Sequence, residues 1–180
     1  MKIVQCKELT IKIRQETNVD YDEVYELVKV SFATENHTEE PDYLNDVRTR
    51  ETFIPELSLV AQLDDGKIVG QVTLYETNIS CGDKSITQLV LSPICVHPDY
   101  FRKGIASEMI KESLIIAKEL DYGAVFLWGK PDFYSKFDFV PTYRYNIRHV
   151  QFGDKNVDFI MVRELTDGVL NGIEGIINID

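Results

Sequence analysis

The segment from Leu91 to Leu120, LSPICVHPDYFRKGIASEMIKESLIIAKEL, constrains the fold more than any other part of the chain. An apolar run ends at His97-Pro98, a short polar turn follows, and Gly104 precedes a long amphipathic stretch. This order predicts a strand, a turn and a helix. The first N–H groups of a helix lack internal partners and carry partial positive charge, so this helix start is suited to binding phosphate groups.

Small residues at the start of the helix strengthen that interpretation. Gly104 has no Cβ, so the backbone can approach a ligand closely there, and Ala106 is small enough to behave similarly. The alternative is an ordinary turn followed by a capped helix. The two small residues do not alone decide between these interpretations.

Length and charge narrow the class of protein. The chain has 180 residues, 44% of them hydrophobic and 27% charged, which predicts a single globular domain over residues 1–180. Its formal net charge of −11 argues against nucleic acid as a partner, because such binding needs cationic side chains against phosphate. A cationic substrate such as an amine is compatible with this charge.

The cysteines and the apolar runs predict a cytoplasmic protein. Cys6, Cys81 and Cys95 are odd in number and widely spaced, which argues against disulfides and against a metal site. Residues 1–10 hold no apolar signal segment, and no run approaches the roughly 20 apolar residues of a membrane span. We therefore expect no metal and no membrane partner.

Hydrophobic periodicity predicts a core over about residues 10–165, followed by a tail over 166–180 that we leave unassigned. The predicted strands cover Thr10–Glu16, Leu57–Leu63, Lys67–Ser80, Ser85–Val96, Ala124–Trp128, Phe139–Arg148 and Val157–Glu164. The predicted helices begin near Asn18 or Asp20, at Pro41, after Gly104 and at Asp132.

Local signals place some of the boundaries. Asp20 and Glu23 have the spacing of a capping box, which indicates a helix start. Asp65-Gly66 predicts a hairpin turn between two strands. Gly123 suits the end of the helix that follows Gly104.

The motif around this helix start resembles that of a known family. His97-Pro98-Asp99-Tyr100 followed by Gly104-Ile105-Ala106 resembles the pyrophosphate-binding motif of the GNAT superfamily, the acetyl-CoA-dependent N-acetyltransferases. Within it, the run GKPDFYSKFDF from Gly129 and the segment from Asp158 to Leu165 resemble uncharacterised bacterial members of the YhbS type. The family signature is Q/R-x-x-G-x-G/A, and its first position falls on Phe101 here. The order of elements over about residues 10–165 agrees. The resemblance implies an α+β fold (an α/β mixed sheet), in which helices flank a central, mostly antiparallel, splayed sheet.

The resemblance implies acetyl-CoA as the co-substrate. In the family, backbone N–H groups at the helix start hold the pyrophosphate, and main-chain groups of the preceding strand bond the thioester and pantetheine. The positions that match in this sequence are Ile94, Cys95 and Val96 in the strand, and Arg102, Lys103, Gly104, Ile105, Ala106 and Ser107 at the helix start.

The resemblance also implies direct attack of a primary amine on the thioester. Tyr134 matches the tyrosine of the family's Y-x-x-x-G-F ending, where it acts as general acid, and Asp138 stands at the glycine position. The alternative is that Tyr134 only packs among neighbouring phenylalanines. A covalent route through Cys95 is possible in principle, but nothing near it resembles an activating histidine–acid pair.

The general base is open. Glu76 is our first choice, and Glu35 and His97 are alternatives, although each residue type is commonly a solvated surface group. A water relay would need none of them. The implied acceptor is a small-molecule or peptide amine, and the resemblance allows for a homodimer. The rival function is a CoA or acyl-CoA sensor without turnover.

Overall fold

A computed structural model describes residues 1–33 and 38–179 of the chain. They group into two compact units, the first formed by residues 1–75 and 92–116 and the second by residues 76–91 and 117–180. Three elements pass from one unit into the other. They are the strands β4 (Ile68–Cys81) and β5 (Lys84–Val96) and the helix α3 (Ile105–Glu119).

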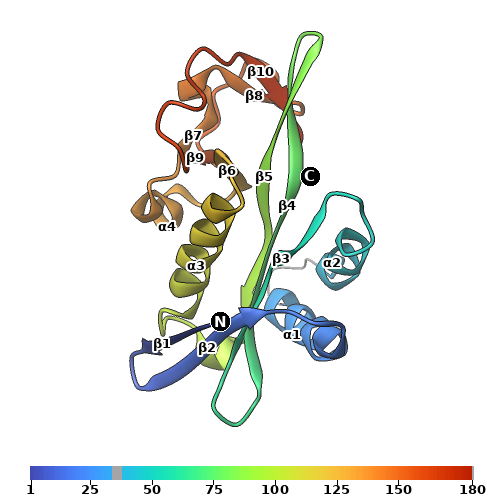
Figure 1. Cartoon of the computed structure of the whole chain (residues 1–180), viewed down its shortest axis with the longest axis vertical. Coiled ribbons are helices and arrows are strands. Elements are labelled where there is room, and N and C mark those ends of the chain that lie inside the picture. Colours follow the sequence, from blue (N-terminus) through green and yellow to red (C-terminus); the bar gives the residue numbers. More distant parts are fainter. Residues whose placement is uncertain (34–37, 180) are drawn as a thin grey trace. The chain divides into compact units, whose positions relative to one another are not determined.

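The first unit is a largely antiparallel sheet with helices on both sides. Strands β1 to β4 pair in sequence order, with antiparallel registers at each step. Helices α1 and α2 lie on one side of these strands and α3 on the other (Figure 1). The remaining elements of this unit are β1 (Lys2–Cys6), β2 (Leu9–Gln15), β3 (Phe53–Gln62), α1 (Tyr21–Phe32), α2 (Glu40–Val47) and the short 3-10 helices η1 (Asn18–Asp20) and η3 (Pro98–Tyr100).

The core of the first unit forms because apolar residues of α1, α2 and the sheet meet on one face. These buried residues include Val24, Val28, Leu44 and Val60. On the opposite face Gly70 permits close packing of α3, since a Cβ there would lie 2.8 Å from the Met109 sulfur. Burying such side chains contributes roughly 1.5–3 kcal/mol each relative to leaving them exposed.

The start of α1 differs from the expected capping box. Asp20 accepts hydrogen bonds from the backbone N–H and the hydroxyl of Thr17, each at 2.8 Å, and forms a two-pronged ion pair with Arg14. Hydrogen bonding to the Arg14 guanidinium lowers the pKa of Asp20 to about 2. The pairing of Asp20 with Glu23 was wrong, because Glu23 instead accepts the N–H of Ile68 on β4 at 2.8 Å.

The second unit contains the mixed part of the sheet. Strand β5 pairs with β6 in parallel, and β6 and β7 both pair antiparallel with β9. Strand β10 pairs antiparallel with β4 and in parallel with β8. The elements that lie wholly in this unit are β6 (Ala124–Trp128), α4 (Pro131–Tyr134), η4 (Ser135–Phe137), β7 (Val140–Pro141), η5 (Thr142–Tyr145), β8 (Ile147–His149), β9 (Ile160–Glu164) and β10 (Gly175–Ile177).

The α+β prediction is confirmed, but several element predictions were wrong. The strand predicted over Phe139–Arg148 is broken into β7, η5 and β8, and between η5 and β8 the chain turns through the left-handed residue Asn146 (φ 56°). Helix α3 ends through Asp121 (φ 64°), so Gly123 is not its stop. The strand β1 and the tail strand β10 were not predicted.

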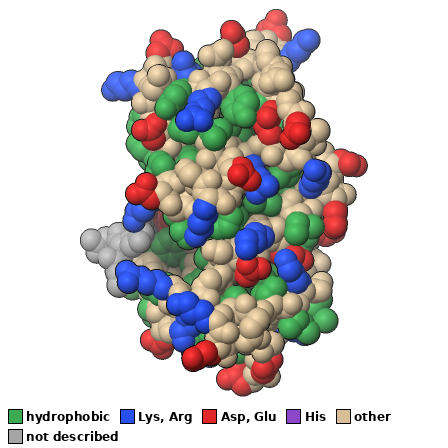
Figure 2. Space-filling model, turned by 90° about the vertical axis from the view of Figure 1, so that its left-hand side faces the viewer, with side chains coloured by type: hydrophobic (Ala, Val, Ile, Leu, Met, Phe, Trp, Pro, Cys, Tyr) green, Lys and Arg blue, Asp and Glu red, His purple; other side chains and the backbone are tan. Residues whose placement is uncertain are grey.

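Surface charge is mixed rather than separated on the face that Figure 2 shows, where basic and acidic side chains alternate over the surface. In the described part of the chain, no helix is long and apolar enough to cross a membrane. The described residues also hold no group of three or more histidine, cysteine, aspartate or glutamate side chains arranged for a metal ion.

Candidate functional site

The turn between β5 and α3 is held by its own backbone and by β4. The N–H of His97 donates to Val69 on β4 at 2.9 Å, which anchors the end of β5. The N–H of Tyr100 then donates to His97 at 2.9 Å and that of Phe101 to Pro98 at 3.1 Å, closing the 3-10 turn. The turn therefore has a defined shape that does not depend on the Phe101 side chain, which is half exposed.

Two residues with positive φ carry the chain from this turn into α3. Arg102 has φ 59° and Gly104 has φ 95°, and a Cβ built on Gly104 would meet no atom within 4 Å. The space beside the Gly104 backbone is therefore open. The glycine is required by its backbone conformation and not by crowding.

The first backbone N–H groups of α3 face outward along the helix axis without helical partners. The ladder of α3 begins with the N–H of Glu108 donating to Gly104 at 3.1 Å, so the N–H groups of Ile105, Ala106 and Ser107 precede it. Ile105 as a whole is 1% exposed, whereas its neighbours Gly104, Ala106 and Ser107 are exposed or half-buried and are the positions that a ligand can reach. The ammonium of Lys103 lies 5.6 Å from the ring of Tyr100 and adds positive charge to the turn. This arrangement fits a bound phosphate group.

The strand segment Ile94–Val96 leads directly into this turn. Ser31 on α1 donates its hydroxyl to the Val96 carbonyl at 3.0 Å, and Cys95 packs in the core of the first unit. Burial raises the pKa of the Cys95 thiol to about 12. The thiol is therefore neutral near pH 7 and is a poor nucleophile.

The predicted residues divide between the two units. The strand residues Ile94, Cys95 and Val96 and the turn residues Arg102 to Ser107 all belong to the first unit, where one continuous segment joins them. Tyr134 and Glu76 belong to the second unit.

Tyr134 stands at the end of α4 in an aromatic setting. Its ring packs edge-to-face with Phe133, with centroids 4.9 Å apart, and with Phe139 at 5.9 Å. Burial raises the pKa of Tyr134 to about 12, so its hydroxyl is protonated near pH 7. Asp138 adopts φ 62°, the left-handed conformation that a glycine takes readily, so it supports the same local turn.

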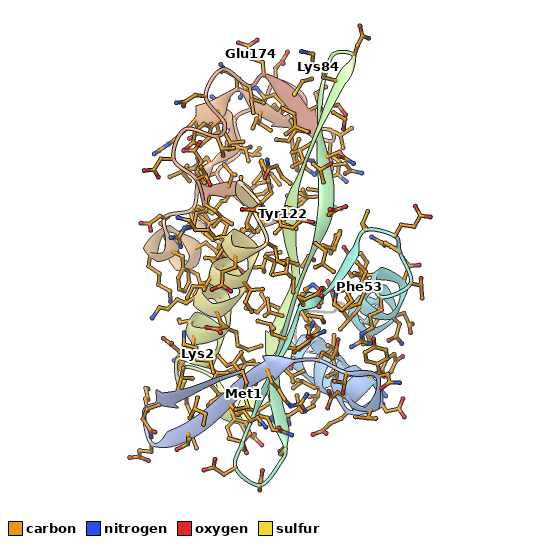
Figure 3. The ribbon with its side chains drawn as sticks, in the orientation of Figure 1. Met1, Lys2, Phe53, Lys84, Tyr122 and Glu174 are labelled. Atoms are coloured by element: carbon orange, nitrogen blue, oxygen red, sulfur yellow. The ribbon has the colours of Figure 1, made fainter. Side chains whose placement is uncertain are left out.

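Glu76 has a partner already. The hydroxyl of Tyr122, which lies between the end of α3 and the start of β6 and is labelled in Figure 3, donates to the Glu76 carboxylate at 2.5 Å. Among the alternatives, His97 accepts the N–H of Asp99 at 3.3 Å through Nδ1, and Glu35 lies outside the described residues. The role of Glu76 as a base stays a prediction.

One buried polar network was missed at the sequence level. Glu16 is 5% exposed and forms an ion pair with Arg48 at the end of α2. Ser58 donates to Glu16 at 2.7 Å and lies 3.0 Å from Thr73, which also accepts from the amide of Gln71 at 2.5 Å. Because Ser58 has only one proton, Thr73 must donate to Ser58, and the network has a single direction.

This network explains why Glu16 is not a candidate base. Its two oxygens are already bonded by Arg48 and Ser58, and the residue is 5% exposed, so neither oxygen is placed to reach a substrate amine. Glu16 follows β2, Arg48 follows α2, and the other three residues lie on β3 and β4, so the members are far apart in the sequence. No local pattern could have identified them together.

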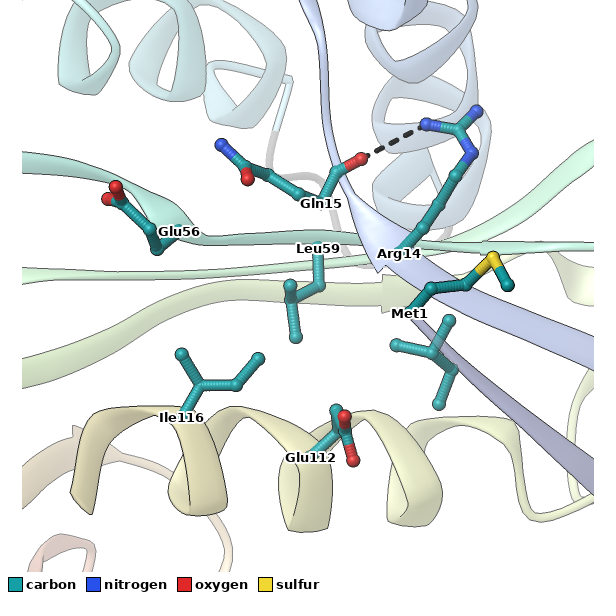
Figure 4. Close-up of a pocket in the computed structure, with 8 residues that line it drawn as sticks. Met1, Arg14, Gln15, Glu56, Leu59, Glu112 and Ile116 are labelled. Carbon is teal, nitrogen blue, oxygen red and sulfur yellow. Dashed lines mark hydrogen bonds between the residues drawn. The ribbon is translucent and has the colours of Figure 1, made fainter. Parts of the chain in front are cut away.

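The first unit also contains a pocket of about 180 Å³ between β2, β3 and α3 (Figure 4). Its wall combines apolar and charged groups, and Arg14 donates to the Gln15 carbonyl at 3.1 Å beside it. None of the predicted cofactor or catalytic residues lines it. The lining residues are Met1, Ile13, Arg14, Gln15, Glu56, Leu59, Glu112 and Ile116.

Comparison with known families decides the assignment. A family model described as an acetyltransferase (GNAT) domain matches residues 12–142. The chain belongs to the GNAT acetyltransferase family. It is therefore an acyltransferase of the EC 2.3.1 class, and the predicted family and fold are confirmed.

Individual relatives agree with this assignment. The chain is 28% identical over 165 residues to the uncharacterised N-acetyltransferase YhbS of Escherichia coli K12, covering 92% of this chain and 93% of that protein. The crystal structure of E. coli YhbS in complex with CoA superposes with a TM-score of 0.82 at 25% identity, over 98% of this chain and 93% of that one. A GNAT family acetyltransferase from Brucella melitensis in complex with acetyl-CoA has the same fold, with a TM-score of 0.73 at 19% identity, over 94% and 96% of the two chains.

Proposed function

We propose that this chain binds acetyl-CoA at the turn before α3 and transfers its acetyl group to a primary amine. The main supporting observation is the open, left-handed turn at Arg102–Gly104, which leads into the N–H groups without helical partners at the start of a 15-residue helix. Support also comes from YhbS, a GNAT relative whose crystal structure contains CoA. Backbone N–H groups of residues 102–107 would bond the pyrophosphate.

The preceding strand would hold the reacting end of the substrate. The parallel register of β5 with β6 consists of the pairs Leu89 with Val125 and Val90 with Phe126, and it stops before the segment Ile94–Val96. We assign the main-chain N–H groups of Ile94–Val96 to the thioester carbonyl, where they would stabilise the oxyanion that forms during attack.

The transfer proceeds by direct attack in a ternary complex. The amine nitrogen forms a bond to the acetyl carbon, the C–S bond breaks, and the thiolate takes the proton of the Tyr134 hydroxyl. The amine releases its extra proton to water or to a base such as Glu76, and the Tyr134 phenolate regains a proton from solvent. The buried, neutral thiol of Cys95 supports this route over an acetyl-cysteine intermediate.

The first test is the melting temperature with and without acetyl-CoA, for the wild type and for Gly104→Glu. A ligand that binds only the native state stabilises it by roughly 2.7 kcal/mol at a hundredfold excess over its Kd. We expect a clear rise for the wild type and a far smaller one for Gly104→Glu. Thiol release on mixing acetyl-CoA with a panel of primary amines then separates an enzyme from a sensor. Binding without thiol release from any amine would favour the sensor.

A further inference from the structure

The ring of Tyr134 rests directly on the backbone of Gly129, at the end of β6. A Cβ placed on Gly129 would lie 2.6 Å from Cδ2 of Tyr134, would overlap its Cε2, and would also come within 3.0 Å of a Leu127 methyl carbon. Contacts under 3.0 Å are not tolerated between carbon atoms, so any larger residue at position 129 must displace the ring.

Backbone conformation does not explain this glycine. The φ angle of Gly129 lies outside the left-handed region, unlike that of Gly104, so an alanine could adopt its backbone without strain. What position 129 requires is space. Among the described residues other than its chain neighbours, the three atoms nearest to a Cβ there belong to Tyr134 and Leu127.

The backbone at Gly129 cannot easily move away from the ring. Its N–H donates to the Phe159 carbonyl at 2.8 Å, which continues the pairing of β6 with β9. The N–H groups of Phe133 and Tyr134 both donate to the Lys130 carbonyl, at 3.0 and 3.2 Å. These bonds fix the start of α4, which begins directly after Lys130. Strain at position 129 would therefore pass to the Tyr134 side chain.

Three neighbours hold the Tyr134 ring in place. Phe133 and Phe139 both pack against it edge-to-face, and Gly129 supports a third side. The atom nearest this support is Cε2, which is bonded to the ring carbon that carries the hydroxyl. A small rotation of the ring about the Cβ atom of Tyr134 moves the hydroxyl further than it moves the ring carbons. A misplacement of a reacting group by about 1 Å can cost on the order of 100-fold in rate.

We propose that Gly129 is a positioning residue for Tyr134: its missing side chain sets the orientation of the phenol that donates a proton to the departing thiolate. This inference rests on the proposed function. Gly129 touches no substrate in it and acts only through the ring of Tyr134.

The test uses Gly129→Ala and a matched control, Gly123→Ala, at the opposite end of β6. A Cβ at position 123 would lie 2.6 Å from a Val169 methyl carbon, which is a comparable clash in the same unit that does not involve Tyr134. We expect both variants to lower the melting temperature. Only Gly129→Ala should lower kcat for CoA release from acetyl-CoA, by roughly 10- to 100-fold, with the Kd for acetyl-CoA unchanged.

A double-variant cycle separates the effect of the Tyr134 hydroxyl position on kcat from the effect of the clash on protein stability. In the Tyr134→Phe background, Gly129→Ala should still lower the melting temperature, because the phenylalanine ring meets the same Cβ. It should lower kcat no further, because the hydroxyl is already absent. A kcat loss that persists in this background, or an equal loss in Gly123→Ala, would overturn the proposal.

The orientation of the Tyr134 ring can be measured by NMR without any catalytic turnover. In protein labelled with ¹³C at the tyrosine ζ carbon, the Tyr134 signal is assigned by its absence in Tyr134→Phe. We expect Gly129→Ala to shift this signal and Gly123→Ala to leave it in place. An unshifted signal in Gly129→Ala would refute the positioning role. If the signal shifts but the wild type releases no CoA, the positioning holds and the proposed reaction fails.

Discussion

The turn that leads into α3 and the aromatic segment around Tyr134 are two differently built regions. In the turn, residues 97–107, the groups offered to a ligand belong to the backbone, and the side chains of Phe101 and Arg102 are exposed. In residues 129–139 the offered group is a single phenol hydroxyl, supported by packed rings and a glycine.

This difference determines which changes each region tolerates. A backbone site depends on φ angles and open space, so it should accept many side chains but few changes at Gly104. A side-chain site depends on one functional group and its contacts, so it should be sensitive to the loss of a single oxygen atom.

The largest expected effect is that of Tyr134→Phe. The change removes one oxygen and keeps the ring that packs on Phe133 and Phe139, so the fold should persist. We expect kcat for CoA release to fall about 100-fold, since general acid catalysis typically contributes 100-fold or more. The Kd for acetyl-CoA should not change. Steady-state kinetics measure kcat, and calorimetric titration measures the Kd. An unchanged kcat would show that Tyr134 only packs against its aromatic neighbours and is not the general acid.

The second-largest effect is expected for Gly104→Glu, which should weaken the binding of acetyl-CoA. The substitution forces a side chain onto φ 95° and places a carboxylate where phosphates are expected, so the Kd for acetyl-CoA should rise about 100-fold, or roughly 2.8 kcal/mol. Calorimetric titration measures it.

Gly82→Glu is the matched control for that change. Gly82 also has positive φ (61°) and open space around its Cβ position, but it lies in the turn between β4 and β5. The control should show a similar conformational cost and unchanged affinity for acetyl-CoA. Equal losses of affinity in both variants would argue that Gly104 matters only for folding.

The same contrast explains what could be read from the sequence. The strand, turn and helix of the backbone site are contiguous, so His97-Pro98 and Gly104 predicted them together, and β6 was predicted with its observed bounds. The buried network of Glu16 and Arg48 was not predictable, because its members meet only after β2 and α2 have packed.

Two further misses have local causes. The strand β1 was missed because its exposed edge shows little apolar patterning, with Lys2 and Val4 half-buried and Ile3 exposed. The long strand predicted after Phe139 was wrong because neither Asn146 nor its left-handed turn stands out in a run of aromatic residues. Both were decided by tertiary contacts and turn geometry.

Cys95→Ala tests the route of transfer and should have a smaller effect. The thiol is buried and its pKa is raised to about 12, so we expect catalysis to continue and no acetylated protein to accumulate on mass spectrometry. The expected cost is one of stability, about 1 kcal/mol for removing a small buried group. Loss of turnover at normal acetyl-CoA affinity would contradict direct attack.

Phe101→Gln should have the smallest effect and gives the sharpest test of the contrast. It places the family's usual residue at the first position of the signature, on a side chain that is 50% exposed. The N–H of Phe101 is already used within the turn, donating to Pro98 at 3.1 Å, and that bond does not depend on the side chain. One added exposed hydrogen bond contributes about 1 kcal/mol at most, so the Kd for acetyl-CoA should fall by no more than about fivefold. A much larger gain would show that the site relies on side chains after all, and that Phe101 weakens it.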